Sequence, residues 1–182
     1  MNGQTREACP AARRTPVVAV DQSPAVRSGI RAVLEASGHF LLVGEAAGVR
    51  SAARPWGLRQ GLIVMDALIA SSEGFHVLRQ VKEGNPHAAL LLLGEWAPDE
   101  EGERVSQAIA FGANGYLRKD CCATLLVGAA LTVVHGAIVV APGAAPHLLN
   151  PEALLGTLRP TPSGLNGATT HLSPVTASAH RC

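Results

Sequence analysis

Short apolar runs that alternate with helix-like segments constrain the fold of this chain more than any other feature. Three of the runs, at 17–20, 62–65 and 89–93, are apolar throughout and do not alternate with polar residues. Such runs are typical of parallel strands that helices cover on both faces. With further strands expected at 40–43 and 116–118, the pattern predicts an α/β domain with a doubly wound, five-stranded parallel sheet.

The segments between these runs carry apolar residues at helical spacing. Ser23 and Pro24 supply an N-cap and a first-turn proline for the first helix. The second helix must be short or distorted, because Pro55 and Gly57 interrupt it. The second to fifth helices are expected at about 49–60, 73–83, 99–111 and 122–135.

Charge and composition divide the 182 residues into three regions. Residues 1–15 carry a net charge of +2, residues 16–142 carry −2 and residues 143–182 carry +1. The last region holds 17 Pro, Gly, Ser or Thr among its 40 residues, a composition that resists packing. We therefore expect a disordered tail at 1–15, one folded domain at 16–142 and a largely disordered tail or linker at 143–182.

Residues 121–141 form an uncharged stretch of 21 residues, long enough to span a membrane. Gly128 and Gly136 interrupt the stretch, and residues 137–140 suit a short strand, so we expect no membrane span. The chain opens without an apolar secretory segment, and its four cysteines form no CxxC pair. These features predict a cytoplasmic protein.

Polar residues follow the strands at the edge where α/β domains bind ligands. The first strand ends at Asp21, the third at Asp66, the fourth at Gly94 and the fifth at Lys119. Carboxylate oxygens suit a hard cation such as Mg²⁺, and a lysine can bind a phosphoryl oxygen. We expect residues 21, 66 and 119 to meet in one acidic hollow with an ammonium group at its rim.

Three segments that contain these residues resemble a known family. Residues 20–29 (VDQSPAVRSG), 64–66 (VMD) and 112–120 (GANGYLRKD) are similar to the receiver domain of bacterial two-component response regulators. The similarity is greatest to the subgroup with LuxR-type (NarL-like) DNA-binding outputs and covers about residues 16–142. It implies the (βα)5 flavodoxin-like receiver fold.

The resemblance also implies a role for each strand-end residue. Asp66 matches the aspartate that accepts a phosphoryl group from a histidine kinase, and Lys119 would pair with the phosphoryl oxygens. Mg²⁺ would be held by an acidic pair after the first strand, by Asp66 and by the carbonyl of Leu68. A Thr or Ser after the fourth strand normally contacts the phosphoryl group and draws in an aromatic residue, which Tyr116 matches.

The sequence departs from the family pattern at three places. Gln22 stands where the acidic pair, begun by Asp21, has its second carboxylate, which predicts a weakened Mg²⁺ site. Gly94 replaces the Thr or Ser of the switch, so no hydroxyl can report a phosphoryl group to Tyr116. Ile69 and Ala70 replace a Met-Pro dipeptide.

Partners are expected on the face that the family commonly uses for dimers, formed by the fourth helix, the fifth strand and the fifth helix. The uncharged stretch at 121–141 supplies the fifth helix, so this face should be apolar, and an exposed apolar patch usually marks an interface. We therefore predict a homodimer. We expect the output domain to be missing, because only residues 172–174 (LSP) match the opening of a LuxR-type DNA-binding module. We therefore expect no direct DNA binding from this chain.

The sequence thus predicts an atypical receiver domain that acts in phosphorelay signalling and transcription regulation, and is not a turnover enzyme. The alternative is a degenerate receiver that works without phosphorylation, through dimerisation or by binding a partner or small molecule. A haloacid-dehalogenase-like phosphotransferase also uses a strand-end aspartate with Mg²⁺. That class needs a second aspartate two residues later, where this chain has Leu68.

Overall fold

Five strands form one parallel sheet in the computed structural model, which describes residues 13–72 and 74–140. The strands lie in the order β2-β1-β3-β4-β5. Their bounds are β1 Thr15–Val20, β2 Phe40–Ala46, β3 Gly61–Asp66, β4 Ala88–Gly94 and β5 Gly115–Arg118. The helices are α1 Pro24–Ala36, α2 Val49–Ala52, α3 Ala67–Ser71, α4 His76–Gly84, α5 Pro98–Ala110 and α6 Ala123–Val134. The doubly wound, five-stranded parallel sheet predicted from the sequence is confirmed.

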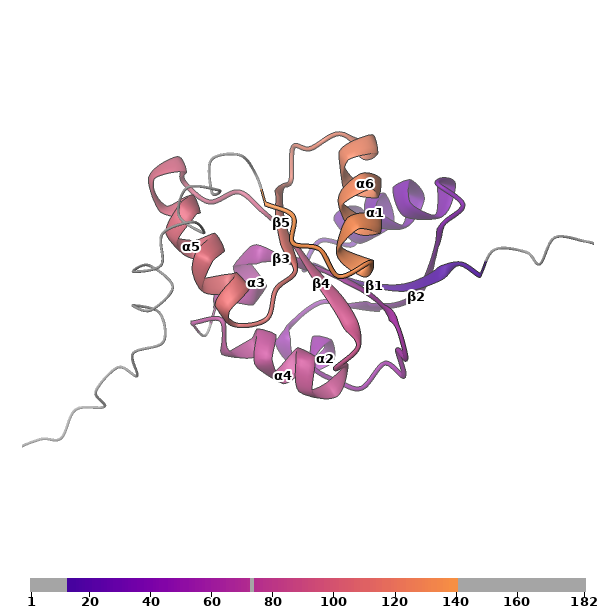
Figure 1. Cartoon of the computed structure of the whole chain (residues 1–182), viewed down its shortest axis with the longest axis horizontal. Helices are drawn as coiled ribbons and strands as arrows, with labels where there is room; N and C mark the ends of the chain where they lie inside the picture. The colour runs from indigo at the N-terminus through magenta and orange to yellow at the C-terminus, as the bar shows by residue number, and fades with distance from the viewer. Residues whose placement is uncertain (1–12, 73, 141–182) are drawn as a thin grey trace, which may run out of the picture.

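Helices cover both faces of the sheet, with α1 and α6 on one face and α2 to α5 on the other (Figure 1). Every residue of β3 and of β4 is buried. The alternate side chains of these strands enter two separate apolar clusters, one on each face. This double burial is why the central strands are apolar throughout their length.

Local signals place the starts of two helices. The Ser23 hydroxyl accepts a hydrogen bond from the Val26 N–H, and Pro24 occupies the first turn of α1. Pro98 likewise occupies the first turn of α5, which also carries Asp99, Glu100 and Glu101. Their negative charges lie near the positive amino end of the helix dipole, where they stabilise the helix.

The prediction of one helix over 73–83 was wrong at its start. The chain forms α3 directly after β3, and α4 begins only at His76. Gly74 and Phe75 separate them with positive φ angles of 61° and 66°, which break the helical path. Asp66 is the N-cap of α3 and accepts from the Leu68 and Ile69 N–H groups, so a helix begins directly after β3. The helix expected near 49–60 is short, as predicted.

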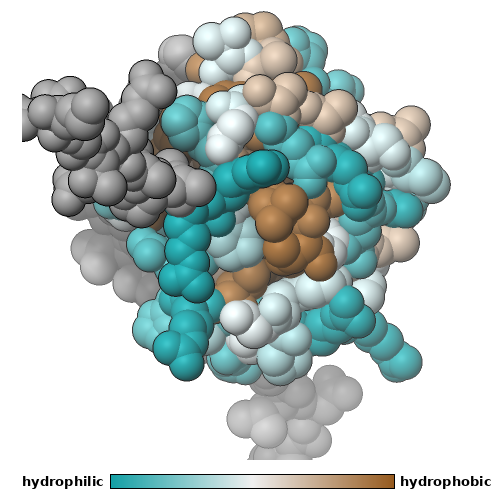
Figure 2. All heavy atoms as spheres, turned by 90° about the vertical axis from the view of Figure 1, so that its right-hand side faces the viewer, coloured by the Kyte–Doolittle hydropathy of each residue, from teal (hydrophilic) through white to brown (hydrophobic). Residues whose placement is uncertain are grey.

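The two edges of the sheet differ. At the β5 edge, the Tyr116 N–H donates to the Val139 carbonyl and the Val139 N–H donates to the Asn114 carbonyl. The strand expected at 137–140 is thus reduced to a single parallel bridge between Gly115 and Val139. At the β2 edge, Leu41 and Val43 are 44% and 47% exposed. Figure 2 shows an apolar patch on this side of the molecule, bordered by hydrophilic residues.

No helix in the described part of the chain is long and apolar enough to cross a membrane. Helix α6 has 12 residues and packs Leu126, Ala129, Ala130 and Val133 into the core. The predicted tail at 143–182, including the match at 172–174, and most of the tail predicted at 1–15 lie outside the described residues.

Candidate functional site

The carboxyl ends of β1, β3 and β5 bring three charged side chains together. Lys119 Nζ donates to Asp21 Oδ2 at 2.9 Å and also to Asp66 Oδ2. The Lys119 N–H donates to the Gly94 carbonyl at 3.0 Å, which ties the loop after β5 to the end of β4. Asp21 and Asp66 are only 3% and 7% exposed. The three residues expected at one hollow therefore do meet there.

Asp21 is held in its charged form. Burial alone would raise the pKa of its carboxyl group, but hydrogen bonds from Lys119 and from the Ser23 N–H outweigh that effect. The Ser23 N–H lies 2.7 Å from Asp21 Oδ1. As a result, the pKa of Asp21 lies below its ordinary value.

Lys119 is held in its charged form by the same contacts. Burial would lower the pKa of its ammonium group, but hydrogen bonds to Asp66 and Asp21 raise the pKa above its ordinary value. The site therefore holds one ammonium group between two carboxylates, and a net negative charge remains.

Both carboxylate oxygens of Asp66 have partners. Oδ2 accepts from Lys119, and Oδ1 accepts from the backbone N–H groups of Leu68 and Ile69 at 2.5 and 3.3 Å. Asp66 is the N-cap of α3, so the start of that helix orients the carboxylate. Oδ2 accepts one hydrogen bond and therefore keeps a lone pair that is available to a phosphoryl group.

The residues implied as Mg²⁺ ligands form an incomplete set of oxygen donors. Asp21 and Asp66 supply two carboxylates, whereas Gln22 is exposed to solvent. The Leu68 carbonyl accepts from the Ser71 hydroxyl at 3.3 Å. Within residues 13–72 and 74–140, no three His, Cys, Asp or Glu side chains are grouped to hold a metal ion. Two carboxylates suffice for Mg²⁺ when phosphate oxygens and water complete its shell, so the residues fit such an ion.

Gly94 occupies a place where a side chain has no room. A Cβ atom there would lie 2.4 Å from the Ala67 Cβ and 3.2 Å from the Tyr116 Cε2. Both distances are shorter than ordinary van der Waals contact, so the glycine permits the close approach of these two residues.

Tyr116, the aromatic residue of the switch, is fully buried. Its ring stacks on Trp96 with centroids 4.7 Å apart and planes 5° apart, and its hydroxyl donates to Glu101 Oε1 at 3.0 Å. Burial and the neighbouring Glu101 carboxylate raise the pKa of Tyr116 to about 12. The tyrosine is thus held in the interior next to Gly94.

Glu101 and Trp96 also contact Tyr116 but were not predicted as site residues. Glu101 is buried, and its Oε1 lies 3.5 Å from Arg118 Nη1. The helical spacing could have revealed it, because Glu101 precedes the buried Val105 and Ala108 by four and seven residues on one face of α5. A carboxylate on an apolar face needs a partner, and Tyr116 and Arg118 provide it.

The family model for the response regulator receiver domain matches residues 17–130. The chain belongs to this family. A receiver domain acts in two-component signalling, where such domains interact with histidine kinases, often dimerise and generally bind Mg²⁺ at an acidic site.

Similar proteins support the same assignment. The receiver is 30% identical to the response regulator protein VraR of Staphylococcus aureus (strain N315) over 127 residues, which are 69% of this chain and 59% of VraR. It is 26% identical to the transcriptional regulatory protein YdfI of Bacillus subtilis (strain 168), over 69% of this chain and 58% of YdfI. The chain thus spans less than two thirds of the length of these relatives.

A solved structure also supports the assignment to the receiver family. The receiver domain of the putative response regulator NarL from Mycobacterium tuberculosis superposes with a TM-score of 0.59 and 28% identity. That match covers 68% of this chain and 98% of the other.

Proposed function

We propose that this chain is a cytoplasmic signalling receiver in which Asp66 accepts a phosphoryl group slowly from a histidine kinase. The observation that carries the proposal is the contact of Lys119 with both Asp21 and Asp66 at a buried strand edge. The protein accepts a signal in this proposal and is not a turnover enzyme.

The reaction is an in-line displacement at phosphorus. An oxygen of Asp66 forms a bond to phosphorus while the bond from phosphorus to the donor atom breaks, and the electron pair leaves with the donor. Lys119 stands beside Asp66 Oδ2, where its positive charge can offset the added phosphoryl charge. Mg²⁺, held by Asp21, Asp66 and the Leu68 carbonyl, would shield charge between carboxylate and phosphoryl group.

Two features of this site favour slow transfer. The Asp66 carboxylate is already hydrogen-bonded through both oxygens, which lowers the nucleophilicity of those oxygens. Gln22 also leaves one carboxylate fewer than the usual set, which weakens the attraction for a divalent cation.

Intact-mass spectrometry after incubation with acetyl phosphate and Mg²⁺ tests the proposal. We expect the parent protein and an Asp120→Asn control to gain the mass of one phosphoryl group, and Asp66→Asn to gain none. Asp120 adjoins Lys119, but its side chain is 68% exposed and it lies outside the Lys119 ion pairs. Absence of the adduct from the parent after prolonged incubation would contradict the role of Asp66.

A second function, signalling without phosphorylation, is supported by the position of Tyr116. The Glu101 hydrogen bond, the Trp96 stack and the space at Gly94 hold the ring in the interior, and none of these contacts involves Asp66. If this state is permanent, Trp96 fluorescence and the phenol pKa of Tyr116 will not change on treatment with beryllofluoride and Mg²⁺. A clear change in either signal would favour the phosphorylation-dependent function.

The proposed homodimer uses the face formed by α5, β5 and α6. Leu125 on α6 is 50% exposed and Ile138, in the segment beside β5, is 57% exposed, so apolar surface is available there. We expect light scattering to give a dimer at tens of micromolar protein and Leu125→Glu with Ile138→Glu to give a monomer. Leu41→Glu, at the opposite edge, is the matched control. A monomeric parent would contradict the dimer.

A further inference from the structure

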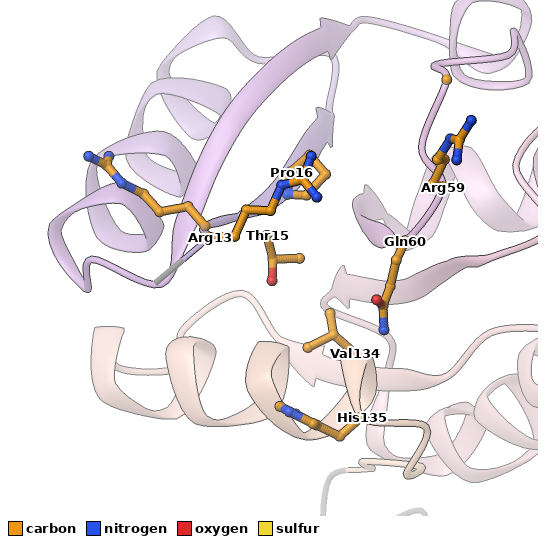
Figure 3. Close-up of a pocket in the computed structure, with 9 residues that line it drawn as sticks. Arg13, Thr15, Pro16, Arg59, Gln60, Val134 and His135 are labelled. Carbon is orange, nitrogen blue, oxygen red and sulfur yellow. The ribbon is translucent and has the colours of Figure 1, made fainter. Parts of the chain in front are cut away.

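A cavity of about 560 Å³ opens at the amino ends of β1 and β3, the opposite end of the sheet from Asp66. Its walls come from the start of β1, the loop before β3 and the end of α6. Thr15, Gln60 and Val134 lie around its middle (Figure 3). This volume is within the range of small-molecule binding sites.

Three arginines, Arg13, Arg14 and Arg59, line this cavity, and no acidic residue does. None of the three has a carboxylate within ion-pair distance among the described residues. Most of the other arginines of the described chain contact a carboxylate or an aromatic ring. Four pair with carboxylates and two lie over aromatic rings, namely Arg27, Arg31, Arg104, Arg118, Arg54 and Arg79. Of the four remaining arginines of the described chain, three therefore line this cavity, and the fourth, Arg50, lies apart on α2.

The topology of the sheet places these three arginines around one cavity. Arg13 and Arg14 precede β1, and Arg59 precedes β3, more than forty positions later in the chain. β1 and β3 are parallel neighbours, so their amino ends adjoin. Arg13 and Arg59 rise from opposite walls and extend outward in Figure 3. With no carboxylate of the described chain to hold them, these exposed side chains can turn inward onto a ligand.

The geometry points to a binding site for a small anion that carries several phosphate groups. Each guanidinium group presents paired N–H donors that match phosphate oxygens, and three such groups favour a multiply charged ligand. The Thr15 hydroxyl and the Gln60 amide supply neutral hydrogen-bonding groups in the same cavity. No Phe, Trp or Tyr is among the described residues that line it, and His135 supplies the one aromatic ring there, so the arginines are the main basis for recognition.

Isothermal titration calorimetry with inorganic triphosphate tests this site in the full chain, without Mg²⁺. We expect saturable binding that Arg14→Gln and Arg59→Gln each weaken about tenfold, because each removes a charged donor. Arg50→Gln is the matched control, since Arg50 is exposed on α2 and outside the cavity. It should alter the affinity less than about twofold, and Asp66→Asn should leave it unchanged.

Five results would overturn the assignment. The first four are no binding at millimolar triphosphate, equal weakening by Arg50→Gln, loss of binding in Asp66→Asn, and citrate binding as tightly as triphosphate. Tighter binding of duplex DNA through the same arginines would also assign the cavity to a macromolecule and contradict the proposal. None of these outcomes depends on whether Asp66 accepts a phosphoryl group.

Discussion

The carboxyl and amino ends of the same sheet carry opposite arrangements of charge. At the carboxyl end, one ammonium group lies between two nearly buried carboxylates. At the amino end, three exposed arginines have no carboxylate partner among the described residues. Buried charges must be paired, or burial becomes very costly, whereas exposed charges remain hydrated without a partner. Removing a charge should therefore affect the stability of the fold at the carboxyl end and ligand binding at the amino end.

Replacing Lys119 should produce the largest loss of stability. Lys119→Met leaves Asp21 and Asp66 as two neighbouring buried carboxylates, and we expect a decrease of about 3 kcal/mol in the free energy of unfolding. Urea denaturation measures this change. Arg59→Met is the matched control and should change stability by less than about 0.5 kcal/mol. Equal losses in the two variants would remove the distinction between the ends.

Filling the space at Gly94 should have the next largest effect. Gly94→Ser places a side chain against Ala67 and Tyr116, and we expect a loss of about 1–3 kcal/mol from overpacking. Near-ultraviolet circular dichroism should show a changed environment for Tyr116 and Trp96. In a double-mutant cycle, Ala67→Gly should recover part of the loss, and strict additivity would contradict a direct contact.

The pH dependence of stability should also separate the two ends. Asp21 has a lowered pKa when folded, so its contribution is fully present above about pH 4 and is lost as the pH falls through the folded value. Lys119 has a raised pKa, so its contribution persists below about pH 10.5 and is lost at higher pH. Denaturation at several pH values should show both slopes, and Asp21→Asn should flatten the acid slope. Arg14→Gln should leave both slopes unchanged.

The smallest effect is expected from the arginines themselves. Arg14→Gln with Arg59→Gln removes two like charges from one cavity and should raise the free energy of unfolding by about 0.5 kcal/mol or less at low salt. Thermal denaturation at low and high salt measures it, and the difference should vanish at high salt, where charges are screened. A lower free energy of unfolding in the double variant would contradict this prediction, because it would mean that the arginines stabilise the fold.

Much of the architecture could be predicted from local sequence patterns. The buried strands are visible as apolar runs, and Ser23 and Pro24 mark the start of α1. Asp21, Asp66 and Lys119 could be selected together because parallel strands place their carboxyl ends on one edge.

Other features could not be predicted because they depend on contacts between distant segments. The stack of Trp96 on Tyr116 and the bridge of Val139 to Gly115 join residues whose side-by-side placement has no local signal. The split between α3 and α4 was also missed, since the positive φ angle of Phe75 is unusual for a residue with a side chain.

The sequence by itself determined the succession of the five strands along the chain and the identity of the charged residues that end or precede them. Hydrophobic periodicity and helix caps act over a few residues, so they can be recognised without a structure. Only the tertiary structure decided which charges are paired. Lys119 reaches two carboxylates at the ends of other strands, while Arg13, Arg14 and Arg59 line one cavity at the opposite end and have no carboxylate partner among the described residues. Pairing depends on distance and burial in space, and the packing of the sheet sets both.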